Sequence, residues 1–199
     1  MPRHNTPFKT VSVNDRLAWR DWLQQYHATS HGVHLIVLKK HSTKLGLSYV
    51  DAVEEALCFG WIDSRTNALD DNHFLLVMTP RKPKSIWAAN NKQRVEKLIR
   101  QGLMTSEGLE KIEAAKRDGS WYIIDAIDAL RIPDDLQQAL NDDATAKKHF
   151  ATFSDSSKKM ILYWILSAKR PETRLKRIRL TVTSAAQNMK PTQYQQDTQ

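Results

Sequence analysis

Three side chains that bind ligands well are spaced two residues apart in one segment. Trp61, Asp63 and Arg65 place an indole, a carboxylate and a guanidinium at alternate positions after Gly60. Alternate residues of a regular strand share one face of a sheet, so these groups are expected to lie side by side. Together they offer bidentate hydrogen bonding and an aromatic surface for stacking, which favours ligand recognition.

Neighbouring segments are expected to extend this set. A helix just before it brings Glu55 near the same end of the sheet, and the turn after the following hairpin brings Arg81 and Trp87. A few convergent polar groups beside aromatic rings are typical of a binding cleft. The predicted ligand-binding residues are therefore Trp61, Asp63, Arg65, Arg81, Trp87 and Glu55.

Two other interpretations of this cluster stay open. Asp63 and Arg81 can form a structural ion pair beside two core tryptophans, because ion-pair networks also gather charged residues. Alternatively, Glu55 or Asp63 acts as a general base, which requires a carboxylate pKa raised by burial. The sequence leaves open whether the protein is an enzyme.

The sequence offers little for nucleophilic or metal chemistry. Cys58 is the single cysteine and lies near the end of an apolar helix, so we interpret it as a core residue. His31, His34 and His41 do not follow a metal-ligand spacing, and no Gly-rich phosphate loop is present. We therefore predict neither a metal site nor a cofactor.

Basic residues gather toward the C-terminus. Residues 158–199 hold nine Lys and Arg against two acidic residues, whereas residues 105–157 hold six against eleven. A basic stripe on a helix favours binding to phosphates, so nucleic acid or another polyanion is an alternative partner. The alternative interpretation is a solvated face that neutralises the acidic segment. The predicted polyanion-binding residues are Arg170, Arg174, Arg177 and Lys169.

The spacing of apolar residues predicts the elements that position these groups. Short β-branched or extended runs predict strands, and residues 69–72 suit a hairpin turn. Strands are expected at 33–38, 61–68 and 73–79, and helices at 14–27, 48–59, 85–101 and 107–118. We therefore predict an α+β fold with a small antiparallel sheet, of about three strands, packed with helices.

A helical module is predicted to follow. Pro133, Ser154 and Pro171 each mark the start of a further helix. The last residues are polar and lack apolar periodicity. The expected organisation is an α+β domain over 1–121, an α-helical C-terminal module over 122–188 and a disordered tail over 189–199.

Composition narrows the class of protein. Hydrophobic residues make up 41% and charged residues 26% of the 199 residues, which is typical of globular proteins. No apolar run approaches the roughly 20 residues that span a bilayer. The N-terminus also lacks the apolar stretch of a secretory signal. We therefore expect a cytoplasmic protein without a membrane span, of unknown oligomeric state.

Several ordered motifs resemble the YdeI/OmpD-associated, bacteriocin-protection family. The most specific is Ala52–Asp63, AVEEALCFGWID, and it is followed by Thr79–Lys82, Ser85–Trp87, Gly108–Trp121 and Ala168–Arg174. The similarity covers about residues 16–185. One departure is Ser64, where the family often has glycine.

The resemblance implies a part in protection against bacteriocins or other antimicrobial peptides. It does not imply catalytic residues. The leading prediction is therefore recognition of a small ligand or protein partner at the cleft of Trp61, Asp63, Arg81 and Trp87. Polyanion binding by the C-terminal helices is the alternative.

Overall fold

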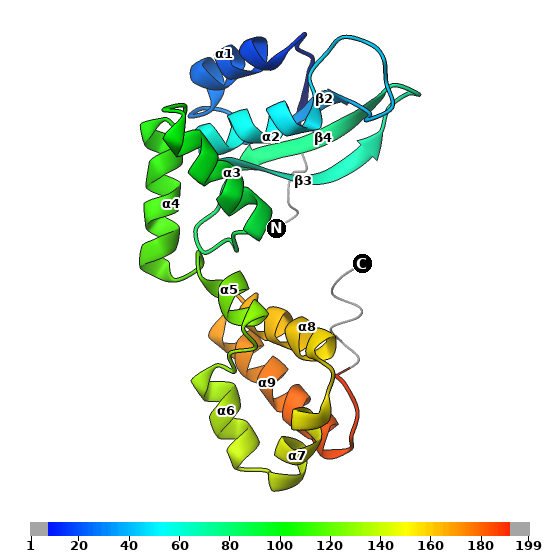
Figure 1. Ribbon diagram of the computed structural model, residues 1–199, viewed down its shortest axis with the longest axis vertical. Helices are drawn as coiled ribbons and strands as arrows, with labels where there is room; N and C mark the ends of the chain where they lie inside the picture. The colour runs from blue at the N-terminus through cyan, green and yellow to red at the C-terminus, as the bar shows by residue number, and fades with distance from the viewer. Residues whose placement is uncertain (1–7, 192–199) are drawn as a thin grey trace, which may run out of the picture. The chain divides into compact units, whose positions relative to one another are not determined.

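The computed structural model describes residues 8–191 and consists of two compact units that divide between Asp118 and Gly119 (Figure 1). The first unit combines a sheet with helices, and the second is helical. The α+β class predicted from the sequence is confirmed. Residues 192–199 of the predicted tail lie outside the described residues.

Within the described residues, the sheet of the first unit has four strands, in the order β1-β2-β4-β3. Strand β1 runs parallel to β2, and the other pairings are antiparallel. The prediction of about three strands missed β1, because a three-residue strand with one buried side chain carries too little pattern. The strands are β1 (Lys9–Val11), β2 (Val33–Leu38), β3 (Trp61–Ala68) and β4 (His73–Pro80).

Alternation along the central strands builds the core on one face of this sheet. Val33, Leu35 and Val37 of β2 are buried, and the residues between them are partly exposed. Leu35 pairs with Leu76 of β4, which is equally buried. Burying one such side chain is worth about 2 kcal/mol, so this stripe fixes the strand register.

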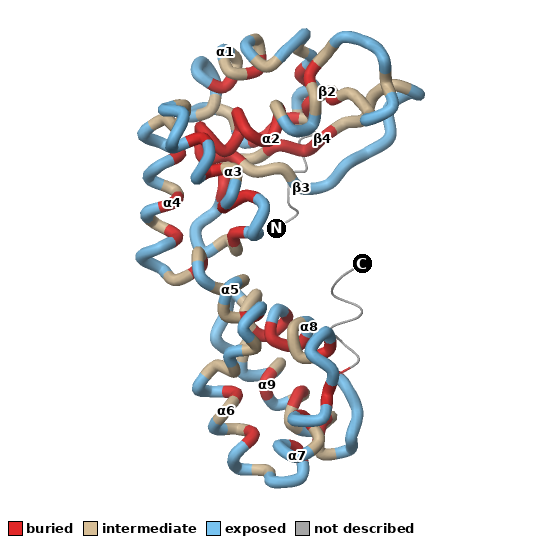
Figure 2. The backbone as a smooth tube through the Cα atoms, viewed as in Figure 1, coloured by how far each residue is buried: buried red, intermediate tan, exposed pale blue. Residues whose placement is uncertain are grey.

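In the part of the chain that the structure describes, four helices complete the first unit. Side chains cap the first two, since Asp15 accepts a hydrogen bond from the amide of Ala18 and Ser48 accepts one from that of Asp51. Figure 2 shows that the second helix is buried along most of its length, and every residue from Ala52 to Cys58 is buried. The helices are α1 (Arg16–Tyr26), α2 (Tyr49–Cys58), α3 (Ala89–Arg100) and α4 (Ser106–Asp118).

Helix α3 begins at Ala89 rather than at Ser85 as predicted. The preceding residues form a loop in which Lys84 adopts a positive φ of 57° and Trp87 is buried. The Arg81 side chain donates hydrogen bonds to this loop, at Ser85 Oγ and the Ile86 carbonyl. These contacts replace the first turn of the predicted helix.

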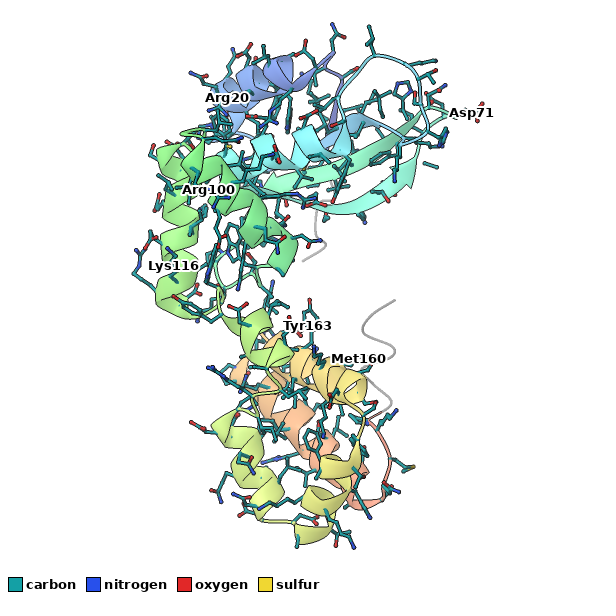
Figure 3. All side chains as sticks on the ribbon, viewed as in Figure 1. Arg20, Asp71, Arg100, Lys116, Met160 and Tyr163 are labelled. Carbon is teal, nitrogen blue, oxygen red and sulfur yellow. The ribbon has the colours of Figure 1, made fainter. Side chains whose placement is uncertain are left out.

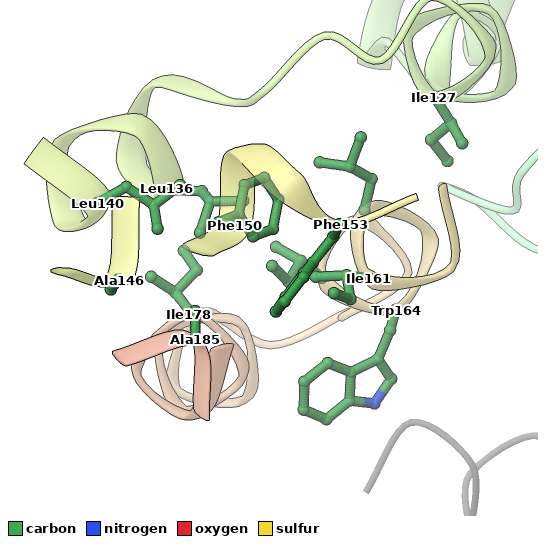
Figure 4. Packing of buried hydrophobic residues seen from close by; sticks show 12 residues of the cluster. Ile127, Leu136, Leu140, Ala146, Phe150, Phe153, Ile161, Trp164, Ile178 and Ala185 are labelled. Carbon is green, nitrogen blue, oxygen red and sulfur yellow. The ribbon is translucent and has the colours of Figure 1, made fainter. Parts of the chain in front are cut away.

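The second unit is a bundle of five helices within the described residues. Its core joins residues of every helix, including Leu136, Phe150, Ile161 and Ile178 (Figure 4). The sequence did not predict α5, whose six residues are too few for a clear period. The helices are α5 (Ile123–Asp128), α6 (Asp134–Asn141), α7 (Ala144–Thr152), α8 (Asp155–Leu166) and α9 (Pro171–Ala186). No helix in residues 8–191 is both long and apolar enough to cross a membrane.

Candidate functional site

Trp61, the first residue of β3, is part of the core. Its side chain is 1% exposed, and its indole N–H donates to the carbonyl of His27 at 3.3 Å. Its ring meets that of Trp22 edge to face at 5.9 Å, and Trp22 stacks on Trp19. This aromatic group fastens α1 to the end of the sheet, which leaves Trp61 no open face toward solvent.

Asp63 lies on the same face of β3 as Trp61 but is only partly buried. Its carboxylate accepts a hydrogen bond from the Tyr49 hydroxyl of α2 at 2.9 Å. Burial raises the pKa of Tyr49, and the Asp63 charge raises it further. The hydroxyl therefore stays protonated and acts as a donor to Asp63.

A β-bulge in β3 interrupts the regular alternation assumed for Arg65. Asp63 pairs with Met78 and Thr66 with Leu76, so Ser64 and Arg65 both lie opposite a single residue of β4. Arg65 is exposed. The expectation that Arg65 alternates regularly with Trp61 and Asp63 is therefore wrong, since an extra residue shifts the register between them.

Glu55 takes part in a different cluster, although α2 positions it as predicted. Its side chain is 2% exposed and accepts hydrogen bonds from Arg16 Nε and Arg20 Nη1, each at 2.6 Å. Arg20 also donates to the carbonyl of Leu103, and Figure 3 labels Arg20 beside α1. Both oxygens of Glu55 are thus held by guanidinium groups of α1.

Glu54 extends this cluster to α3. Its carboxylate accepts hydrogen bonds from Arg16 and from Lys97 Nζ, both at 2.9 Å. The network therefore connects α1, α2 and α3 through two buried carboxylates. Sequence reasoning missed Arg16, Arg20 and Lys97 as partners. The available signal was the pair of acidic residues in an apolar helix, together with two arginines spaced i, i+4.

The network makes the stability of the first unit depend on pH. Burial tends to raise the pKa of Glu54, but hydrogen bonds from Lys97 and Arg16 outweigh it, so the pKa lies below its ordinary value of 4.5. Ionised Glu54 therefore stabilises the fold above the unfolded-state pKa, and this contribution is lost as the pH falls through the folded-state pKa. Urea unfolding at pH 6 and pH 3 should show a smaller pH dependence for Glu54→Gln than for the unchanged protein. Equal pH dependence of the two would contradict this assignment.

Arg81 and Trp87 lie together at the start of the loop after β4. The Arg81 guanidinium stacks over the Trp87 ring at 3.7 Å, and the two side chains are 3% and 1% exposed. Arg81 Nη1 binds Ser85 Oγ at 3.1 Å and the Ile86 carbonyl at 3.3 Å. Nε and Nη2 are buried and have no hydrogen-bond acceptor among the described residues. A buried guanidinium with two such donors is costly unless something compensates it.

Arg81 does not form an ion pair with Asp63 in the described part of the chain. Burial lowers the pKa of Arg81 to about 10, and the charge of Asp63 opposes this shift. Asp63 makes its hydrogen bond with Tyr49, and no salt bridge joins it to Arg81 in the described part of the chain. The Asp63–Arg81 contact considered from the sequence is therefore a longer-range interaction of charges.

The predicted basic stripe is partly used inside the second unit. Arg174 forms a bidentate pair with Asp135, at 2.6 and 2.8 Å. Arg177 donates to the carbonyl of Trp164 and stacks on its ring. Lys169 and Arg170 are exposed. Polyanion binding stays a prediction that rests mainly on these last two residues.

The remaining candidates are Cys58 and the histidines at positions 31, 34 and 41. Cys58 is fully buried, and burial raises the pKa of its thiol to about 11, so it is a poor nucleophile at neutral pH. His34 lies against Phe8, and the His41 ring is bonded to the carbonyl of Asp71. Residues 8–191 contain no group of three His, Cys, Asp or Glu placed to hold a metal.

Comparison with known proteins divides the chain in a similar way. Residues 129–188 match the family described as bacteriocin-protection, YdeI or OmpD-associated, and residues 11–111 match a domain of unknown function, DUF8412. The Ala168–Arg174 motif lies within the first match, whereas Ala52–Asp63 lies within the second. No curated protein and no solved structure matches the chain.

Proposed function

Residues 129–188 match the YdeI or OmpD-associated, bacteriocin-protection family, and on this premise we propose that the first unit of the chain recognises a small anionic ligand at Arg81. The ligand carries a carboxylate or a phosphate. Its recognition in the cytoplasm contributes to protection against bacteriocins or similar peptides.

The observation that carries this proposal is the pair of buried Arg81 donors, Nε and Nη2. These two N–H groups lie on the same edge of the guanidinium and point in parallel. That edge matches the spacing of two oxygens in a carboxylate or phosphate, which it binds through two hydrogen bonds. An anion there would neutralise the buried charge and supply both acceptors.

The other predicted residues then have separate roles. Trp87 backs the guanidinium and fixes its plane, while the charge of Asp63 helps to keep it protonated. Trp61 holds the strand in place and does not contact the ligand. Arg81 is 3% exposed, so entry requires movement of the loop over residues 82–88, which holds Arg81 through Ser85 and Ile86.

The variant Arg81→Met tests this assignment, because methionine keeps much of the volume and removes the charge. If the buried charge of Arg81 is kept for binding, it destabilises the fold. The variant should therefore melt at the same or a higher temperature than the unchanged protein. Cells that produce it should nevertheless lose protection against a bacteriocin. In thermal-shift measurements, inorganic phosphate or acetate should stabilise the unchanged protein and not the variant.

Arg65→Met is the matched control, since Arg65 is exposed and lies in the bulge. It should keep protection, melting temperature and the response to anions. Arg81→Lys keeps the charge but lacks the paired donors, so it should give partial protection. If Arg81→Met instead melts several degrees lower and protection falls only with the amount of folded protein, Arg81 is structural and the proposal fails.

A further inference from the structure

The second unit contains a cavity of about 280 Å³ that lies entirely among its own helices. This volume is close to the lower limit of about 300 Å³ for pockets that hold small molecules. Residues from α6, α7, α8 and the α5–α6 connection surround it. They are Leu130, Ile132, Gln137, Leu140, Lys147, Phe150, Ala151, Lys158 and Leu162.

The walls of this cavity are mainly apolar. Leu140, Phe150 and Leu162 belong to the buried core of the unit, so the cavity opens directly onto packed hydrocarbon. Leu130 borders it from a left-handed backbone conformation, with φ of 52°. A leucine rarely adopts this conformation, whose cost is about 1–2 kcal/mol. The lining is therefore suited to the body of an apolar molecule.

The polar part of the lining has one sign of charge. Lys147 and Lys158 are the only charged residues among the nine that line the cavity, and Gln137 adds an amide. The Lys158 ammonium donates to the Ala151 carbonyl at 2.8 Å, which holds it beside the cavity. An ammonium group has three N–H donors, so this bond leaves others for a ligand. This lining is therefore electrostatically complementary to an anion.

We propose that this cavity binds a small amphiphilic carboxylate, with an unbranched apolar chain of medium length lying against Leu140, Phe150 and Leu162. Its carboxylate is paired with Lys147 and Lys158. The apolar chain gains from burial, and the two ammonium groups select the anion over a neutral molecule of equal length. This site lies in the second unit and does not depend on the role of Arg81.

Calorimetric titration of the full chain carrying Arg81→Met, which removes the anion site proposed in the first unit, with decanoate, decanol, decyltrimethylammonium and acetate separates these contributions. Decanoate should bind one site with a dissociation constant on the order of tens of micromolar. Decanol should bind at least tenfold more weakly, and the cation and acetate should not bind measurably. Decanol that binds as tightly as decanoate, or equal binding of the cation, would overturn the proposal.

Variants localise the site. The double substitution of Lys147→Gln and Lys158→Gln should reduce decanoate affinity to that of decanol, while Lys148→Gln, on an exposed neighbour outside the cavity, should not change it. Ala151→Trp should fill the cavity from the exposed side of α7 and abolish binding without altering the melting temperature greatly. Saturable binding that survives Ala151→Trp would place the ligand elsewhere and refute the assignment.

Discussion

Replacing Glu55 by alanine is expected to lower the free energy of unfolding by about 3–5 kcal/mol, as measured by urea denaturation near neutral pH. The carboxylate is 2% exposed and accepts hydrogen bonds from the guanidinium groups of both Arg16 and Arg20. Its removal leaves the partly buried Arg20 without a carboxylate partner, while Arg16 keeps only Glu54 and Asp51. The loss therefore includes desolvation in addition to two broken hydrogen bonds.

Two further variants separate charge from side-chain volume. Glu55→Gln keeps the shape but not the charge. It should therefore lower the free energy of unfolding by less than the alanine variant does, but by more than about 1 kcal/mol. Glu96→Ala removes an exposed glutamate of α3 and should change stability by no more than about 0.5 kcal/mol. A Glu55→Ala variant as stable as Glu96→Ala would show that the network does not hold α1 against α2.

Gly108→Ala is expected to destabilise the first unit by about 3 kcal/mol or more. A Cβ at this position would lie 2.2 Å from the carbonyl oxygen of Cys58 and 2.7 Å from Cε of Met104. The methionine can move, but the carbonyl belongs to the backbone at the end of α2. That carbonyl also accepts hydrogen bonds from the hydroxyl and the amide of Thr105, so displacing α4 breaks both.

Gly102→Ala provides the comparison for this prediction. Gly102 has a φ of 68°, and a Cβ there would meet nothing within 4 Å. Its substitution should cost only the strain of the left-handed conformation, about 1 kcal/mol. Similar melting temperatures for the two variants would mean that α4 does not pack against α2 as closely as the structure places it.

Local pattern was sufficient for most elements of the first unit. The alternation in β2, the Asp and Asn residues of the hairpin turn and the caps at Asp15 and Ser48 all act within a few residues along the chain. The β-bulge was not predictable in this way. Ser64 and Arg65 are both polar, so an extra residue there leaves no trace in the hydrophobic pattern.

The candidate site was less predictable, because it depends on partners far away in the sequence. Glu55 was singled out, but its partner Arg16 is 39 residues away and becomes available only when α1 packs on α2. Arg81 was expected in a binding cleft or in an ion pair with Asp63. Arg81 is buried because the following loop folds back over it. The spacing of apolar residues in that loop does not predict this conformation.

The bulge at Ser64 and Arg65 also affects how this protein behaves at high concentration. Strand β3 is an edge strand, so its outer backbone groups are a template on which a strand of another molecule can add. A bulge twists the edge and interrupts its hydrogen-bonding repeat, and an exposed arginine at that point adds a charge that an incoming identical strand must meet. The bulge therefore opposes the addition of strands from other molecules to β3, and with it aggregation.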